Sequence, residues 1–317
     1  MRGGEVCMLP FKPYSCLILK MKNPILAALS QKSLSVGIVA STVFFGTTSH
    51  ALASILIAGA PSTASWLNDV QAKIAGTGLI SGSVDVLNVV SSTPTLAQLQ
   101  AYDAVLFFSD ASFADPTTFG NVLADYVDAG GGVVQATFSF WIAGIVIGGR
   151  WRAQNYDVWQ PGGQISPGNL TLGTIYDPSN PILAGVTSFN GGSSSFYNTV
   201  GSLNPTVGPL NPGAVAVADW SNGAPLIAVN TSTFAGKIAG LNFYPPSSDA
   251  RSDFWVSSTD GALLMANSLN FVTKQVSVPE PNSLLGLFAI GTLGAASTLK
   301  RKLKSSQSTE KKPTKVG

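Results

Sequence analysis

The central part of the chain offers few of the side chains that enzymes use for catalysis. The chain has two cysteines and one histidine, and all three lie within the first fifty residues. The hydroxyl groups of Thr137 and Ser139 are candidate nucleophiles, but a hydroxyl is a weak nucleophile unless a neighbouring base activates it. No motif assigns that role to Lys73 or Lys237. A zinc site is not expected either, because its usual ligands are thiolates and imidazoles.

Two acidic stretches have the carboxylates that calcium accepts. Asp110 and Asp115 lie in SDASFAD, and Asp249 and Asp253 lie in SSDARSD. Hard cations bind carboxylate and carbonyl oxygens, but neither stretch has the spacing of a known calcium loop. Such residues also cap helices and form turns. The segment 59–62 lacks the G-x-G-x-x-G spacing of a phosphate loop, so we predict neither a metal nor a cofactor.

An aromatic cluster is the feature most open to a binding function. Trp141, Trp151 and Trp159 lie close in sequence to charged residues. Tryptophan faces stack on sugar rings, while arginine and aspartate side chains hydrogen-bond to hydroxyls. The alternative is that these aromatic residues form the core of an irregular loop region. The full cluster comprises Phe138, Phe140, Trp141, Arg150, Trp151, Arg152, Tyr156, Asp157 and Trp159.

The elements that must position these side chains alternate strands with helices. Continuous apolar runs are typical of buried parallel strands, and amphipathic stretches between them predict crossover helices. The pattern therefore predicts an α/β domain with a mostly parallel sheet, with long loops and irregular strands over residues 138–211. Strands are expected at 54–60, 83–90, 103–109, 133–137, 214–219, 225–230 and 237–243, and helices at 61–75, 95–100, 117–129 and 253–271.

The distribution of charge excludes one class of partner. The whole chain has a formal net charge of +2, but residues 54–282 contain six lysines and arginines against fourteen acidic residues. The basic excess lies in the two terminal regions. Nucleic-acid binding depends on clustered cations that face phosphates. We therefore expect an acidic domain that does not bind nucleic acid.

The segment 21–53 has the pattern of a signal peptide. A weakly basic start and an apolar run over 34–46 precede an A-x-A site formed by Ala51 and Ala53. This order predicts export and cleavage by a signal peptidase before Ser54. An N-terminal membrane anchor that stays attached is the alternative, although the apolar run is shorter than the roughly 20 residues of a spanning helix.

The C-terminal region combines a motif, an apolar run and a basic cluster. Pro279, Glu280 and Pro281 precede an apolar run over 283–299. The length of this run, roughly 17 residues, is near the lower limit for a transmembrane helix. Basic residues at the end of such a helix stay on the cytoplasmic side, which leaves the acidic domain outside. The basic cluster consists of Lys300, Arg301, Lys302 and Lys304.

This order of motif, helix and basic cluster resembles the PEP-CTERM sorting signal of exported proteins in Gram-negative bacteria. The resemblance covers about the last forty residues of the chain. It implies that an exosortase, a membrane transpeptidase, recognises the Pro-Glu-Pro region and that the helix and tail are removed. About a dozen polar residues follow the basic cluster, whereas family signals usually end soon after it. A plain C-terminal transmembrane anchor is the alternative.

The central domain resembles the class I glutamine amidotransferase-like family in its broad, ThuA-like sense. The runs that carry the likeness are LQAYDAVLFFSD, FGNVLADYVDAGGGVVQATFSFW, DPSNPILAGVTSF and GKIAGLNFYP. The likeness implies a flavodoxin-like three-layer α/β/α sandwich. Active members carry a cysteine after the strand that corresponds to 133–137, with a histidine and an acid to activate it. This chain has Thr137, Phe138 and Ser139 there instead.

Together these observations predict an exported envelope or extracellular-matrix protein that is noncatalytic and either structural or glycan-binding. The alternative is a hydrolase or amidotransferase-like enzyme with an unconventional hydroxyl nucleophile. Expected partners are the export machinery with its signal peptidase, an exosortase, the membrane and extracellular polysaccharide. The expected parts are an extension before a start at Met21 (1–20), a signal peptide (21–53), the α/β domain (54–273), the sorting signal (274–304) and a polar basic tail (305–317).

Overall fold

The computed structural model describes residues 53–201 and 209–274. These residues cover the predicted α/β domain except for 202–208. The predicted signal peptide up to Leu52, including Ala51, lies outside the described residues. So do the sorting motif at 279–281, the apolar run at 283–299 and the basic cluster that follows it.

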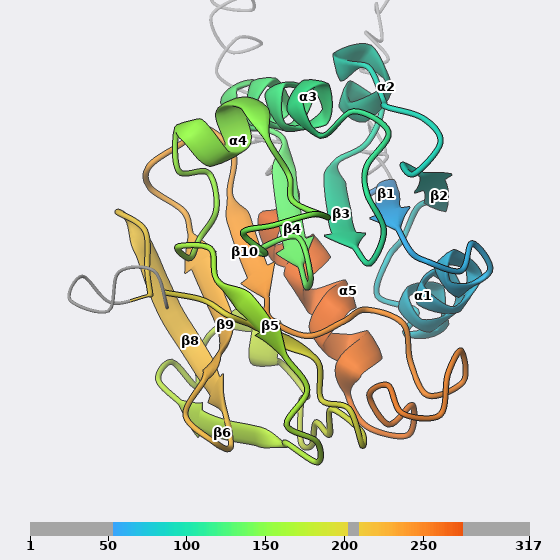
Figure 1. Cartoon of the computed structure of the whole chain (residues 1–317), viewed down its shortest axis with the longest axis vertical. Coiled ribbons are helices and arrows are strands. Elements are labelled where there is room, and N and C mark those ends of the chain that lie inside the picture. The colour runs from blue at the N-terminus through green and yellow to red at the C-terminus, as the bar shows by residue number, and fades with distance from the viewer. Residues whose placement is uncertain (1–52, 202–208, 275–317) are drawn as a thin grey trace, which may run out of the picture. The chain divides into compact units, whose positions relative to one another are not determined.

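One eight-stranded sheet forms the middle layer, with the order β2-β1-β3-β4-β10-β9-β8-β6 (Figure 1). The strands β2, β1, β3, β4 and β10 run parallel to one another. Beyond β10, the strands β9, β8 and β6 extend the sheet with antiparallel pairing. A separate two-stranded sheet pairs β5 with β7. The strands are β1 Ile55–Ala60, β2 Val84–Asn88, β3 Ala104–Ser109, β4 Gly132–Ala136, β5 Gly163–Ile165, β6 Leu172–Ile175, β7 Tyr197–Thr199, β8 Ala214–Trp220, β9 Pro225–Asn230 and β10 Ile238–Leu241.

Helices cover both faces of the sheet. The α-helices are α1 Trp66–Gly76, α2 Leu96–Gln100, α3 Pro116–Asp128, α4 Gly149–Ala153 and α5 Gly261–Val272, and a 3-10 helix, η1, spans Pro181–Leu183. Successive strand residues point to opposite faces, so the apolar strands supply two cores. Leu106 packs with α1 and α5 on one face, and Phe107 packs with α2, α3 and α4 on the other. The predicted three-layer α/β/α sandwich is confirmed.

Local sequence signals set the ends of several helices. Thr95 caps α2 in a capping box with Gln98, and Asp115 caps α3 through the amides of Thr117 and Thr118. Such caps satisfy backbone N–H groups that have no partner within the helix. After α3 the chain turns at Gly130, whose φ of +84° is a conformation that glycine adopts without steric cost. Strand β4 then begins two residues later, close to its predicted start.

The last helix begins later than the sequence predicts. We expected a helix over 253–271, but α5 begins at Gly261. The preceding segment is held in an irregular path by tertiary contacts. The Asp253 carboxylate accepts a hydrogen bond from the Ser194 hydroxyl, and the amide of Val256 donates to the carbonyl of Asn190 at 2.9 Å. These contacts and the burial of Phe254 outweigh the helical propensity of the segment.

The region predicted as irregular contains short elements rather than loops alone. Helix α4 and strands β5, β6 and β7 all lie between residues 138 and 211, and β6 forms the edge of the main sheet. Helix α4 packs so closely on α3 that a side chain at Gly120 would collide with the carbonyl of Gly148. Within 53–201 and 209–274, none of the helices has both the length and the apolar character needed to cross a membrane.

Candidate functional site

The two candidate nucleophiles act as buried hydrogen-bond donors. Thr137 and Ser139 follow β4 and are both fully buried. The Thr137 hydroxyl donates to the Asn242 side-chain oxygen at 3.0 Å, and the Ser139 hydroxyl donates to the carbonyl of Ala136 at 2.6 Å. Each hydroxyl proton is thus directed at an amide oxygen, which is not a base. The geometry explains these side chains as supports of the turn after β4.

The lysines weighed as bases for these hydroxyls are engaged elsewhere. The Lys73 ammonium pairs with the Asp249 carboxylate. The Lys237 ammonium donates to the carbonyl of Phe271 at 3.3 Å and lies 5.2 Å from the centre of the Phe271 ring. Neither contact involves the turn after β4.

The tryptophans predicted as glycan contacts lie mainly in the core, which corrects that prediction for two of them. Trp151 is 0% exposed and Trp159 is 1% exposed. Trp151 packs edge-on against Phe107 and Trp159 against Phe140, so both fill space between the sheet and the helical layer. Side chains so placed cannot reach a polysaccharide. Trp141 is half-buried, at the start of a loop with exposed Ile142.

The charged residues of the same cluster hold this region together. The Asp157 carboxylate is buried, accepts a hydrogen bond from Gln135 at 2.7 Å and lies 3.2 Å from the Arg152 guanidinium. Burial raises the pKa of Asp157, and the nearby Arg152 charge opposes that rise. Arg150 instead pairs with Asp128 at 2.5 Å and joins α4 to α3. These contacts are structural.

The acidic stretches considered for calcium do not converge. Asp115 is occupied as the cap of α3, and hydrogen bonds from Thr118 lower its pKa. Asp249 pairs with Lys73, which lowers its pKa, and Asp253 pairs with Arg251. Within residues 53–201 and 209–274, no group of three or more acidic, histidine or cysteine side chains is arranged to hold a metal.

Side chains from distant parts of the chain meet where the central strands end. The carboxyl ends of parallel strands share one edge of a sheet, and ligands of open α/β folds bind beyond that edge. At this edge Ser62 follows β1, Asp110 follows β3, Phe138 follows β4 and Tyr244 follows β10. We call the whole group the strand-end cluster; it comprises Ser62, Trp66, Asp110, Phe138, Phe196, Tyr244, Arg251 and Phe254.

The polar half of the strand-end cluster is organised around Asp110. Its Oδ2 atom accepts hydrogen bonds from the Ser62 hydroxyl at 2.6 Å and from the Tyr244 hydroxyl at 3.4 Å. Burial raises the pKa of Tyr244 well above its ordinary value, and the Asp110 charge adds to the rise. Tyr244 therefore stays a neutral hydrogen-bond donor at physiological pH.

The aromatic half surrounds Tyr244 and Arg251. The Tyr244 ring stacks on Phe138 with centroids 5.3 Å apart and meets Phe254 edge-on at 5.0 Å. The Arg251 guanidinium lies 4.1 Å from the centre of the Phe254 ring and 5.6 Å from that of Trp66. Arg251 also binds Asp253 through two hydrogen bonds of 2.5 and 2.8 Å, which fixes the cation over the rings.

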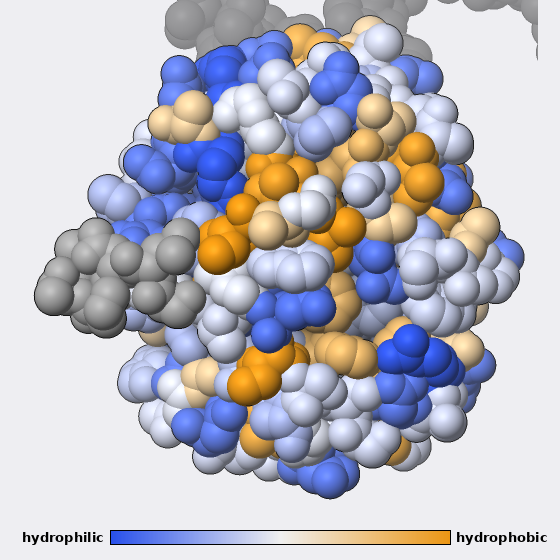
Figure 2. Space-filling view, viewed as in Figure 1, coloured by the Kyte–Doolittle hydropathy of each residue, from blue (hydrophilic) through white to orange (hydrophobic). Residues whose placement is uncertain are grey.

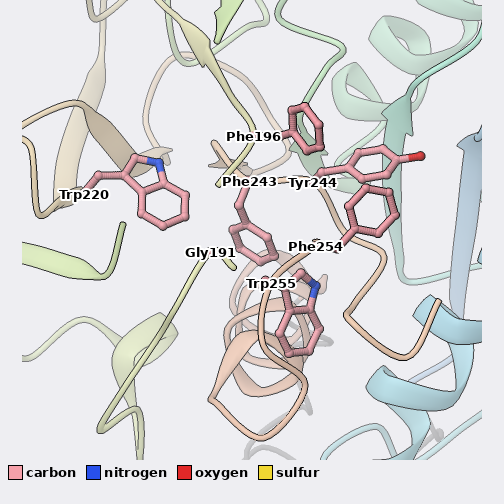
Figure 3. Close-up of a pocket in the computed structure, with 7 residues that line it drawn as sticks. All are labelled: Gly191, Phe196, Trp220, Phe243, Tyr244, Phe254 and Trp255. Atoms are coloured by element: carbon pink, nitrogen blue, oxygen red, sulfur yellow. The ribbon is translucent and has the colours of Figure 1, made fainter. Parts of the chain in front are cut away.

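A small pocket extends inward from the cluster. Its cavity volume is about 10 Å³, roughly the space that one water molecule needs (Figure 3). Figure 3 shows the ring of Phe243 at its centre, with Phe196, Tyr244 and Phe254 to one side and Trp220 to the other. The pocket is smaller than the roughly 300–1,000 Å³ of typical ligand sites. The residues that line it are Gly191, Phe196, Trp220, Phe243, Tyr244, Phe254 and Trp255.

The outer part of the strand-end cluster is accessible. Ser62 and Arg251 are exposed, and Trp66, Asp110 and Phe196 are half-buried. On the face seen in Figure 2, hydrophobic residues form groups among hydrophilic ones. The strand-end cluster brings accessible aromatic faces together with hydrogen-bonding groups.

Reasoning from the sequence missed most of this cluster. In the sequence, Asp110 is interpreted as a calcium ligand or as a cap or turn residue, and no pattern singles out Trp66, Phe196, Tyr244 and Arg251. These residues lie far apart in the chain and share no motif. The available signal was positional, since the residues that follow successive buried parallel strands meet at one edge of the sheet.

Comparison with known proteins gives one sequence match and several structural ones. Residues 277–302 match the PEP-CTERM protein-sorting motif. No curated protein has significant sequence similarity to the chain. Among solved structures, the cytoplasmic protein STM1381 from Salmonella typhimurium LT2 superposes with a TM-score of 0.51 at 16% identity, over 70% of this chain and 100% of that one.

Two ThuA-like proteins are also similar. The one from Parabacteroides merdae has a TM-score of 0.47 and 13% identity over 72% of this chain and 93% of that one. The one from Bacteroides uniformis has a TM-score of 0.48 and 13% identity over 69% of this chain and 91% of that one. Identities this low concern the fold alone. The chain thus carries a PEP-CTERM sorting motif, which supports export through an exosortase, after a domain that shares its α/β fold with a solved bacterial protein.

Proposed function

We propose that this protein is a noncatalytic component of the cell envelope or extracellular matrix that binds a neutral polysaccharide through the strand-end cluster. The single observation that carries the proposal is the convergence of accessible Trp66 and Phe196 with Arg251, Asp110 and Ser62 at the carboxyl edge of the sheet. The sorting motif at 277–302 supports an exported destination, where polysaccharides are available.

The chemistry of the cluster suits a sugar ring. Aromatic faces stack on the apolar face of a sugar, and carboxylate, hydroxyl and guanidinium groups hydrogen-bond to its hydroxyls. The pocket, with a cavity volume of about 10 Å³, is too small to enclose a sugar ring or a cofactor, which favours a polymer that lies across the surface. The formal charge of about −8 over residues 54–282 disfavours an acidic polymer.

The hydrogen bonds of the turn after β4 support a noncatalytic role. Thr137 and Ser139 are buried and direct their protons at amide oxygens, so neither has the adjacent base that a hydroxyl nucleophile requires. Covalent labelling of either hydroxyl by an electrophilic probe, in the folded protein, would contradict this part of the proposal.

Binding of the purified full chain to neutral envelope polysaccharides tests the ligand. We expect Trp66→Ala and Arg251→Gln each to weaken binding at least about tenfold, which corresponds to about 1.4 kcal/mol. The measurement is the dissociation constant on a glycan array or by affinity electrophoresis. Tyr176→Ala is the matched control, because Tyr176 is an exposed aromatic residue directly after β6, outside the cluster.

Thermal unfolding of each variant separates lost binding from lost folding. Trp66 packs on Tyr244 and Phe254, so its replacement lowers stability as well. Arg251 is 43% exposed but packs on Phe254 and binds Asp253, so its melting temperature needs the same check. If the parent protein binds no envelope polysaccharide, the glycan-binding proposal is wrong and a purely structural role remains.

A further inference from the structure

The backbone amide of Ser54 donates to a side-chain carboxylate at the point where the domain begins. Its nitrogen lies 2.9 Å from Oδ2 of Asp103, and the amide of Asp103 donates to the Ser54 carbonyl, also at 2.9 Å. The next residue, Ile55, starts the fully buried central strand β1. Ser54 is therefore tied to the start of β3 through both of its backbone groups.

Ala53, on the other side of the same peptide bond, is held less firmly. Its amide donates to the Ser81 hydroxyl at 3.1 Å, and its carbonyl accepts from the amide of Gly82 at 3.0 Å. Ser81 is exposed and Gly82 is half-buried. Water can therefore replace both bonds if Ala53 is removed.

We propose that the export machinery cleaves the Ala53–Ser54 bond and that Asp103 is the binding site for the new N-terminal ammonium group. A signal peptidase breaks the bond between the Ala53 carbonyl carbon and the Ser54 nitrogen. Water supplies a hydroxyl to the Ala53 carboxyl group and a hydrogen to the nitrogen, which then takes up a proton. The amide hydrogen bond at 2.9 Å becomes an ammonium–carboxylate pair.

The surroundings of Asp103 suit a cation at this position. Among the described residues, Asp103 forms no ion pair with a lysine or arginine side chain. The other titratable groups nearby are Asp85 on β2, Tyr102, Tyr126 on α3 and Lys274 after α5. Burial raises the pKa of both tyrosines. The Asp85 carboxylate raises the pKa of Tyr102 further, and the Asp103 carboxylate raises that of Tyr126, so both tyrosines remain neutral. Lys274, 5.5 Å from the centre of the Tyr126 ring, is the one cation of this set.

The ion pair between the Ser54 ammonium and the Asp103 carboxylate makes the stability of the domain depend on pH. A neighbouring carboxylate raises the pKa of an α-amino group above its ordinary value of about 8. The stabilisation is then fully present below about pH 8 and is lost as the pH rises through the raised pKa. Cleavage thus converts an ordinary hydrogen bond into an ion pair that joins the start of β1 to the start of β3.

The first experiment is mass spectrometry of the mature N-terminus after the full chain is expressed in a Gram-negative host. The expected N-terminal residue is Ser54. A mature chain that begins at Leu52, after Ala51, overturns the proposal, and so does a chain that keeps its preceding segment.

The second experiment compares Asp103→Asn with Asp85→Asn in the exported chain, by acylation of the N-terminal amine at pH 8. A pKa raised by about one unit leaves about one fifth as much free amine, so Asp103→Asn should be acylated about fivefold faster than the parent. The matched control Asp85→Asn changes a carboxylate of the same sign on the neighbouring strand, with no hydrogen bond to Ser54. Equal acylation rates in the parent and both variants overturn the role of Asp103.

Thermal unfolding gives an independent readout. The stability difference between the parent and Asp103→Asn should be present at pH 7 and shrink toward pH 10. A difference that stays constant with pH indicates a structural role for Asp103 without the ammonium and overturns the proposal. None of these outcomes depends on whether the strand-end cluster binds a glycan.

Discussion

At the scale of single residues, the Asp157 carboxylate is the buried charge on which the loop after β4 depends. It is 1% exposed and contacts Gln135 and Arg152. Arg152 also donates to the carbonyls of Ser139 and Trp141, at 2.9 and 3.3 Å. One guanidinium group thus compensates a buried carboxylate and fixes the backbone that leads into the loop.

Arg152→Met should destabilise the protein by about 3–5 kcal/mol at pH 7, because it leaves a buried carboxylate unpaired. The pKa of Asp157 is raised, so the folded state binds its proton more tightly than the unfolded state. The free energy of unfolding of the variant should therefore decrease as the pH rises above about 4, the ordinary pKa of an aspartate. It should be higher at pH 5 than at pH 7. Urea unfolding at pH 5 and pH 7 measures the difference.

Arg150→Met is the matched control for this prediction. Arg150 pairs with partly exposed Asp128, and exposed pairs contribute about 1 kcal/mol or less. Arg150→Met should therefore lower the free energy of unfolding only slightly at both pH values. A loss in Arg152→Met that is the same at pH 5 and pH 7 would show that Asp157 does not take up the proton.

At the scale of elements, the N-terminus of α3 depends on one side chain. The Asp115 Oδ1 atom accepts from the amides of Thr117 and Thr118, at 3.1 and 2.9 Å. The Oδ2 atom accepts from the Thr118 hydroxyl at 2.7 Å. This cap starts the helix that carries Phe119 and Leu123 into the core.

Asp115→Ala should lower the melting temperature by about 2–4 °C, because it leaves backbone amides of α3 without acceptors. Asp115→Asn keeps an acceptor oxygen and should retain most of the stability. Hydrogen bonds from Thr118 lower the pKa of Asp115. The extra stability that aspartate gives over asparagine is therefore present above the ordinary pKa of an aspartate and is lost as the pH falls through the lowered pKa of Asp115. Calorimetry at pH 7 and pH 3 checks both statements; equal melting temperatures for all three proteins at pH 7 would be inconsistent with a cap.

At the scale of the whole domain, both ends of the described chain lie at one edge of the sheet and the strand-end cluster at the other. Ser54 contacts Asp103 at the start of β3, and the carbonyl of Val272 at the end of α5 lies close to Gly132 at the start of β4. The cluster lies beyond the opposite ends of the same strands.

Replacing both Pro279 and Glu280 with alanine should prevent processing, because the sorting motif is the feature that an exosortase recognises. The variant should stay in the membrane fraction with its C-terminal residues, whereas the parent loses them. Cell fractionation with mass spectrometry of the C-terminal peptide measures this. Glu310→Ala, which changes an acid beyond the basic cluster, is the control and should be processed as the parent is. Normal processing of the double variant would mean that the motif is not used.

The sequence by itself determined the elements whose signals are local. Apolar runs predicted β1, β3, β4, β8 and β9 almost to the residue, and the helix expected over 95–100 is α2, which Thr95 caps. The sorting motif is equally local, since it is recognised from residues adjacent in the chain. These predictions succeed because the deciding interactions, burial of a continuous apolar run or capping of a backbone amide, act between near neighbours.

Only the tertiary structure decided which side chains are accessible and which meet. Trp66 and Trp151 have the same side chain, yet one lies half-buried at the strand ends and the other, on α4, is fully buried in the core. The start of α5 and the strand-end cluster also depend on contacts between residues far apart in the chain, such as Tyr244 with Asp110. Which of two like side chains is exposed, and which distant residues converge, depends on the packing of the layers, and no local pattern in the sequence encodes it.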